Sequence, residues 1–184
     1  MLSLILTAEL SGVTDLRPQD TEDEPYYYTF KVQCTSCRET HPNWVSFNRF
    51  VRPLAAPLTS STIVASFANQ VEKEQHEIPG SRGEANFVWK CKLCQRTHSA
   101  SIVSGPNAYA AGDDKRKGQK VIDLECRGLE FTEFKPDGEW EAKGVESSTP
   151  FTGIDLAEGE WYDYDEKAGD EVAIKELKWE LGRA

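Results

Sequence analysis

Four of the five cysteines form two Cys-x-x-Cys pairs, and this pattern constrains the fold of the 184-residue chain more than any other feature. The pairs are Cys34-Thr-Ser-Cys37 and Cys91-Lys-Leu-Cys94, in the pattern C-x2-C-x53-C-x2-C. Two intervening residues let both sulfurs of a pair face the same ion, and Zn²⁺ in structural sites takes four such ligands at the corners of a tetrahedron. The sequence therefore predicts that one zinc ion per chain is bound by Cys34, Cys37, Cys91 and Cys94.

Disulfides and thioredoxin-like redox chemistry are the rival uses of paired cysteines. The apolar N-terminal stretch has no basic segment and no small-residue cleavage site, so it does not resemble a secretory signal. Thiols stay reduced inside cells. A redox motif would place one pair at the start of a helix, whereas both pairs here follow strand patterns. Zinc is the favoured interpretation, with the cytoplasm, and secondarily the nucleus, as the expected location.

Charge and hydropathy exclude several classes of partner. The net charge of −10 disfavours nucleic acid, because nucleic-acid binders present a basic face. No apolar run approaches the ~18–20 residues that span a membrane. The length fits one domain. We expect a monomer that binds another protein of unknown identity, with a metal-related protein as one candidate.

Two internal repeats accompany the cysteine pairs. The segment Phe30–His41 matches Phe87–His98 at an offset of 57, and alternating apolar residues before each pair predict a strand that leads into a hairpin knuckle. A weaker match joins Leu6–Val13 to Ile122–Leu129 at an offset of 116. Chance similarity of amphipathic strands is the alternative explanation for this second match.

The predicted fold is mainly β, with two pseudo-symmetric β half-domains joined around one four-cysteine zinc site. The chain is divided into a single domain of two similar halves, residues 1–51 and 73–184, with an insertion at 52–72. A short helix is expected over Ser60–Gln75, because apolar residues form one stripe after a serine cap. Residues 11–25 are expected to form a loop, and Trp161–Leu181 a hairpin with a bulge before Leu177.

Polar residues around the knuckles have two interpretations. Four thiolates and one Zn²⁺ carry a net charge of −2, so nearby cations would stabilise the cluster; alternatively, they line a solvated strand edge. These cations are Lys31, Arg38, Lys90, Lys92 and Arg96. His41 and His98 recur after the two pairs, and we expect them to support the site or to hold the loops rather than bind the metal, because four cysteines already complete a tetrahedron.

The fifth cysteine, Cys126, separates two functional hypotheses. In the favoured one the protein is a non-catalytic interaction or metal-handling protein, and Cys126 is a core residue, because its counterpart in the second repeat is Leu10. In the alternative, the protein is a zinc-scaffolded thiol enzyme resembling methionine sulfoxide reductases, with Cys126 as nucleophile.

The acidic run Asp163–Glu166 is also open to two interpretations. It is either a hairpin end that packs its tyrosines on the sheet or a docking surface. A docking surface would tolerate charge reversal of Asp163, Asp165 and Glu166 with little loss of stability.

Several segments together resemble the eukaryotic family of CXXC-motif-containing zinc-binding proteins, a group of unknown function. They are Leu16-Arg-Pro18, the two cysteine pairs, Gly80–Gly83, Glu125–Glu130 and Gly159–Ala168 with Val172 and Ile174. The resemblance implies a mainly β, pseudo-symmetric protein with one zinc ion held by the four paired cysteines. Family members usually have a shorter stretch between the pairs, so the insertion near Arg52–Glu72 is the expected departure.

Overall fold

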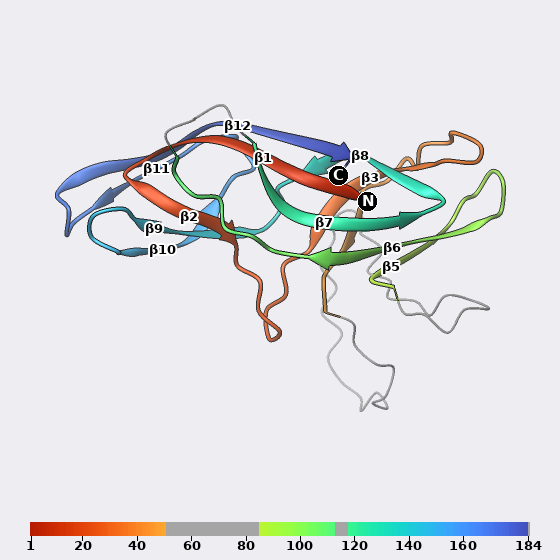
Figure 1. Cartoon of the computed structure of the whole chain (residues 1–184), viewed down its shortest axis with the longest axis horizontal. Helices are drawn as coiled ribbons and strands as arrows, with labels where there is room; N and C mark the ends of the chain where they lie inside the picture. Colours follow the sequence, from red (N-terminus) through yellow and green to blue (C-terminus); the bar gives the residue numbers. More distant parts are fainter. Residues whose placement is uncertain (51–84, 113–117, 184) are drawn as a thin grey trace, which may run out of the picture.

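Strands are the only regular secondary structure in the residues that the computed structural model describes, which are 1–50, 85–112 and 118–183 (Figure 1). This confirms the mainly β prediction. Within these ranges no helix has the length and apolar character needed to span a bilayer. The helix expected over Ser60–Gln75 and the insertion at 52–72 lie outside the described residues. The division into halves at 51 and 73 therefore stays a prediction.

The described strands form one large sheet and two small ones. The large sheet has the order β11-β12-β1-β7-β6-β5. Its strands are β1 (Leu2–Ser11), β5 (Phe87–Lys90), β6 (Thr97–Ser104), β7 (Gln119–Arg127), β11 (Trp161–Asp165) and β12 (Asp170–Arg183). The small sheets are β10-β9-β2 and β4-β3-β8. Their strands are β2 (Val13–Pro18), β3 (Tyr28–Cys34), β4 (Val45–Phe47), β8 (Leu129–Lys135), β9 (Glu139–Gly144) and β10 (Pro150–Asp155).

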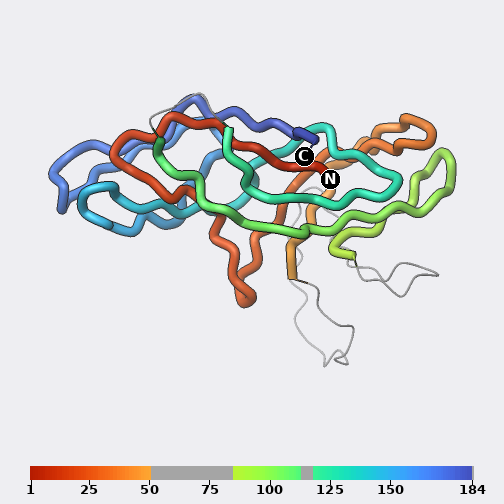
Figure 2. The backbone as a smooth tube through the Cα atoms, in the orientation of Figure 1, coloured from red at the N-terminus to blue at the C-terminus, as the bar shows by residue number. Residues whose placement is uncertain are grey.

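The chain is elongated, and its two ends differ. The loops after β3 and β5, which carry the cysteine pairs, project side by side at one end of the long axis, in orange and yellow-green (Figure 2). The β11–β12 hairpin, in blue, lies at the other end. The cysteine loops and the acidic C-terminal hairpin are therefore far apart.

The second repeat is a real structural repeat. Strands β1 and β2 flank Gly12, and β7 and β8 flank Gly128, with closely corresponding boundaries at an offset of 116. Both glycines lie in the left-handed region, with φ of 71° and 79°. A residue with a Cβ rarely adopts this conformation. Each half of the chain thus uses a glycine to turn one strand into another.

An aromatic cluster packs the knuckle strands against each other. Phe30 of β3 stacks on Phe131 of β8, with ring centroids 4.5 Å apart. Phe47 of β4 stacks on Phe87 of β5 at 5.3 Å. All four rings are buried, and offset stacking adds to the free energy gained from burial. The cluster joins the hairpin of the first cysteine pair to that of the second.

Two local predictions have opposite outcomes. The C-terminal hairpin is confirmed, and so is its bulge, because the pairing of β1 with β12 shifts between Thr7 and Glu9, opposite the positive-φ residue Glu176. The loop prediction for 11–25 is wrong over Val13–Pro18, which forms β2. Its register on β9 shifts between Thr14 and Arg17, so its buried residues, Val13, Leu16 and Pro18, do not keep a strand period of two throughout, because the first two are three positions apart.

The acidic run at the end of β11 has one member with a structural role. Asp165 is 1% exposed. Its carboxylate accepts hydrogen bonds from the hydroxyls of Ser147 and Thr149 and from the backbone N–H groups of Lys167 and Ala168. These bonds tie the β9–β10 turn to the β11–β12 turn. Asp165 is therefore a structural residue of these turns rather than part of an exposed docking surface, and we expect reversal of its charge to break the bonds.

We expect Asp165→Ala to lower the melting temperature by about 5 °C or more at pH 7, because it removes a buried network of charge-assisted hydrogen bonds. The hydrogen bond from Ser147 is the main cause that lowers the pKa of Asp165. Its contribution to stability is therefore present above the ordinary aspartate pKa and is lost as the pH falls below about 4. Thermal melts across this range should show the difference from the unmodified protein shrinking on acidification.

The matched control is Asp163→Ala, because Asp163 lies on the same strand but is exposed. Its melt should stay within about 2 °C of the unmodified protein. Equal effects of the two substitutions would contradict the structural role of Asp165.

Candidate metal centre

The first cysteine pair lies in a hairpin knuckle that the backbone closes on itself. Cys34 is the last residue of β3, and its N–H donates to the carbonyl of Glu39 at 2.9 Å. The N–H of Arg38 donates back to the carbonyl of Cys34 at 2.9 Å. Arg38 has a φ of 63°, which turns the chain sharply. The turn directs Cys34 and Cys37 toward the same space.

The second pair repeats these contacts at the same offset of 57 residues. The N–H of Cys91 donates to the carbonyl of Arg96 at 3.0 Å, and the N–H of Gln95 donates to the carbonyl of Cys91 at 2.9 Å. Gln95, the counterpart of Arg38, has a φ of 59°. The knuckle repeat predicted from the sequence is therefore confirmed down to individual backbone hydrogen bonds.

The structure brings all four predicted cysteines together. Their sulfurs lie within 4.8 Å of one another. The Sγ atoms of Cys34 and Cys94 are 3.7 Å apart, and those of Cys37 and Cys91 are 3.5 Å apart. A tetrahedral site with Zn–S bonds of ~2.3 Å requires sulfurs about 3.8 Å apart. The cluster thus fits one zinc ion, and these two close contacts each join one knuckle to the other.

The acidity of the thiols reflects this crowding. Burial opposes ionisation of Cys34, but the backbone N–H groups of Cys37 and Ser36 lower its pKa to about 6. The N–H of Glu39 favours the Cys37 thiolate, yet burial and the Cys91 thiol raise the pKa of Cys37 to about 12. Neighbouring thiolates repel each other, and a bound cation offsets this repulsion.

Both histidines of the knuckle repeat are buried, as expected for supporting residues. Nε2 of His98 lies 3.2 Å from Sγ of Cys34, so with its proton on Nε2 it donates to that sulfur. Nδ1 of His41 instead accepts the N–H of Asn43 at 3.0 Å. Trp89 lies between the two rings, with centroids 5.8 Å from His41 and 5.6 Å from His98. The repeat is therefore asymmetric at this level.

Gly128 is a supporting residue that the cysteine spacing did not indicate. A Cβ at this position would lie 2.1 Å from Nδ1 of His98. The carbonyl of Gly128 accepts both the N–H of Thr35, at 3.1 Å, and its hydroxyl, at 2.9 Å. Gly128 thus contacts both knuckles at once. Its place in the second repeat was visible in the sequence, but its contacts depend on the pairing of β3 with β8.

Cys126 is separate from the sulfur cluster. It is partly buried on β7 and packs against the core. It lines a cavity of about 330 Å³ together with Met1, Leu2, Thr35, Leu129, Glu130 and Arg183. Burial raises its pKa to about 11. A thiol of this kind is predominantly protonated at neutral pH, which does not suit a nucleophile.

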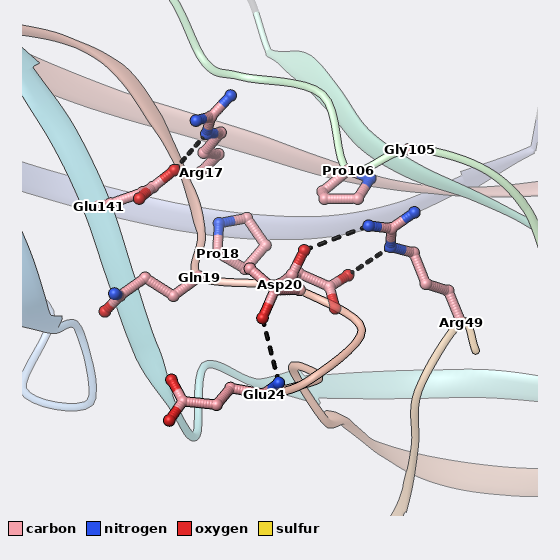
Figure 3. Close-up of a pocket in the computed structure, with 10 residues that line it drawn as sticks. Arg17, Pro18, Gln19, Asp20, Glu24, Arg49, Gly105, Pro106 and Glu141 are labelled. Atoms are coloured by element: carbon pink, nitrogen blue, oxygen red, sulfur yellow. Dashed lines mark hydrogen bonds and ion pairs between the residues drawn. The ribbon is translucent and has the colours of Figure 1, made fainter.

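Another cavity, of about 360 Å³, lies among charged residues of the β2 end and neighbouring loops (Figure 3). None of its lining residues is a cysteine. Arg49 pairs with the buried carboxylate of Asp20 at 2.8 Å, and Arg17 pairs with Glu141 at 2.5 Å. The two arginines that line this cavity are therefore neutralised by carboxylates of the same cavity. Its lining residues do not form a recognisable catalytic arrangement.

Comparisons with known proteins agree on one family. The sequence matches the profile described as "CXXC motif containing zinc binding protein, eukaryotic" over residues 3–53 and 59–182. The break at 54–58 falls inside the expected insertion, and the match resumes before that stretch ends. The chain is 43% identical to a UPF0587 protein of Schizosaccharomyces pombe, covering 99% of this chain and 98% of the relative.

A second relative and a solved structure extend this match. The CXXC motif containing zinc binding protein of Bos taurus is 35% identical, covering 96% of this chain and 94% of the relative. The crystal structure of C1orf123 superposes with a TM-score of 0.77 at 32% identity, covering 100% of this chain and 99% of that one. The similarity therefore extends over the whole fold as well as the cysteine pairs.

We expect Gly128→Ala to weaken zinc binding about tenfold or more, because the new methyl group would displace His98 from Cys34 and disturb both knuckles. Competition with a zinc chelator of known affinity measures the effect. Gly169→Ala is the matched control, because Gly169 has a similar φ of 72° but open space where a Cβ would lie. Equal zinc affinity of the two variants would contradict the supporting role of Gly128.

Proposed function

The chain belongs to the eukaryotic CXXC motif containing zinc binding protein family, and from this premise we propose that it is a non-catalytic interaction protein with a structural zinc site. Cys34 and Cys37 from one knuckle and Cys91 and Cys94 from the other hold one ion. The observation that carries this proposal is the pair of sulfur contacts, 3.7 Å and 3.5 Å, that cross between the knuckles.

A structural role follows from how the ligands are divided. Each knuckle supplies two sulfurs, and two sulfurs do not complete a tetrahedron, so binding requires the knuckles to be docked. The bound ion neutralises thiolate charge and fixes the hairpins relative to each other. Structural zinc sites contribute ~10–16 kcal/mol of apparent binding free energy. This is comparable to the ~5–15 kcal/mol by which a typical protein is stable.

A non-catalytic role is supported by the ligand count and by Cys126. Catalytic zinc sites keep one position open for water or substrate, whereas four cysteines fill every position. The alternative of a zinc-scaffolded thiol enzyme needs a reactive Cys126. Its partial burial and a pKa raised to about 11 oppose that role.

We expect Cys91→Ser to retain less than about a tenth of the zinc and to lose most of its cooperative thermal unfolding, because the remaining three sulfurs bind the ion weakly. Cys126→Ser is the matched control and should retain one zinc per chain with a nearly normal melt. Metal content by atomic spectroscopy and melts followed by circular dichroism provide the two readouts.

Two results would contradict the proposal. A full zinc content in Cys91→Ser would exclude the four-cysteine site. Removal of zinc from the unmodified protein by a chelator, with an unchanged melt, would exclude a structural role. That second result would instead favour metal handling, for which the ion must leave without unfolding the chain.

A further prediction addresses the enzyme alternative. In the zinc-loaded protein at pH 8, Cys126 should react with iodoacetamide at about a hundredth of the rate of an ordinary peptide thiol, because only ~0.1% of it is ionised. The rate should rise about tenfold for each unit of pH up to about 10. Mass spectrometry of the modified peptide measures it. Rapid modification at pH 8 would support Cys126 as a nucleophile.

A further inference from the structure

The tips of the two knuckles form an exposed basic surface on an acidic chain. This surface, here termed the knuckle face, consists of Arg38, Lys90, Lys92, Leu93 and Arg96, all of which are exposed. Leu93 is 64% exposed and lies between Lys92 and Cys94 at the tip of the second knuckle. The two knuckle loops that carry it, after β3 and β5, project at one end of the long axis (Figure 1).

The cations of the knuckle face have no carboxylate partners among the described residues. Within the described residues, Arg38, Lys90 and Lys92 form no ion pair. Among these residues the side chain of Arg96 donates a hydrogen bond only to the hydroxyl of Ser36, at 3.3 Å. Elsewhere in the described chain, arginines pair with carboxylates. Arg17, Arg49 and Arg127 pair with Glu141, Asp20 and Glu125. Among the described arginines, the two that pair with no carboxylate, Arg38 and Arg96, therefore both lie at the knuckles, beside Lys90 and Lys92.

Compensation of the metal centre accounts for only part of this charge. Four thiolates and one Zn²⁺ carry −2, and the two hairpins, residues 31–41 and 88–98, contain a single carboxylate, that of Glu39. Their cations are Lys31, Arg38, Lys90, Lys92 and Arg96. The excess positive charge is free to attract a partner, and the exposed Leu93, next to Lys92 in the sequence, adds apolar surface.

We propose that the knuckle face binds an acidic segment of another protein, with an apolar side chain of that segment packed on Leu93. Carboxylates of the segment pair with Lys90, Lys92 and Arg96, and Arg38 extends the surface onto the first knuckle. This inference rests on the proposed function in one respect, because the zinc ion is what holds the two knuckles side by side.

Nucleic acid fits the knuckle face less well than an acidic peptide does. Single-stranded nucleic acids are bound by exposed aromatic rings on which bases stack. The two knuckles, residues 34–41 and 91–98, contain no Phe, Tyr or Trp, and the nearby Trp89 is buried. The rest of the chain is strongly acidic and repels a long polyanion. A short acidic segment contacts the basic end alone.

A second copy of the chain is also a poorer occupant. The acidic β11–β12 hairpin, with exposed Tyr162 and Tyr164, is a complementary surface on the same chain. It lies at the opposite end of the long axis (Figure 1). End-to-end contacts between opposite ends of identical chains are heterologous, and they generate open filaments unless the rotation between copies closes a ring. A foreign segment gives a finite complex.

Fluorescence anisotropy with a defined probe tests the proposal. The probe is a short fluorescein-labelled peptide rich in Asp and Glu around two central Leu residues, and its counterpart has Asn and Gln in place of the acids. The zinc-loaded protein should bind the acidic peptide at least about tenfold more tightly than the amide peptide at low salt. The affinity should fall as salt is added.

Two pairs of charge reversals locate the binding site. The double variant Lys90→Glu, Lys92→Glu should weaken binding about tenfold or more. The control, Lys167→Glu with Lys178→Glu, changes the net charge equally at exposed positions of the β11–β12 hairpin, so it should weaken binding less than about threefold. Leu93→Ser leaves the charge unchanged and should still weaken binding about threefold or more.

The outcomes separate this proposal from the metal site. Zinc content is measured for every variant. If the zinc-loaded unmodified protein does not bind the acidic peptide, the docking proposal is overturned and the proposed function stands. If the unmodified protein holds no zinc, the proposed function fails first. Equal weakening by both double variants, tighter binding of an oligothymidine probe, or self-association abolished by the Lys90 and Lys92 reversals would each overturn the docking proposal.

Discussion

The close approach of four cysteine sulfurs, whose thiolates repel one another, is the constraint on which this structure depends. The sulfurs of Cys34, Cys37, Cys91 and Cys94 lie within 4.8 Å of one another, where like charges repel and a bound cation offsets the repulsion. The fold brings them together through the aromatic cluster of β3, β4, β5 and β8, which docks one knuckle hairpin on the other. Burial of these rings and compensation of the sulfur charge therefore both stabilise the docking of one knuckle hairpin on the other.

The surroundings of the sulfurs show that both internal repeats meet at this contact. Gly128, the turn glycine of the longer-offset repeat, accepts hydrogen bonds from Thr35 of the first knuckle and packs on His98 of the second. His98 in turn contacts the sulfur of Cys34. A metal centre held by neighbours from three separate segments keeps its ligands in place. The ligands of the cluster are therefore fixed by contacts that join both knuckles to the β7–β8 turn.

The two ends of the molecule are built on different electrostatic principles. At the far end, the buried carboxylate of Asp165 is satisfied by hydroxyl and backbone donors of two turns, so its charge serves stability. At the knuckle end, Lys90, Lys92 and Leu93 are exposed. No carboxylate within the described residues pairs with the two lysines, so their charge is available to a partner. In the sequence, the acidic residues of Asp163–Glu166 and the basic residues of the second knuckle could both be read as exposed surface charge. The structure separates them, because burial gives Asp165 a structural role.

The sequence by itself determined the features whose hydrogen bonds or residue patterns lie within a short segment of the chain. Cysteine spacing specified both knuckles, since their hydrogen bonds join residues four or five positions apart, and the alternation of apolar residues specified the strands that lead into them. The broken phase before Leu177 likewise located the bulge of β12. Tertiary structure alone decided that β3 pairs with β8, that Val13–Pro18 forms a strand on β9, and that Asp165 is buried. Each of these features depends on a contact between segments that are separate in the sequence. The alternation of apolar and polar residues within one segment does not specify which other segment supplies its hydrogen-bonding partner.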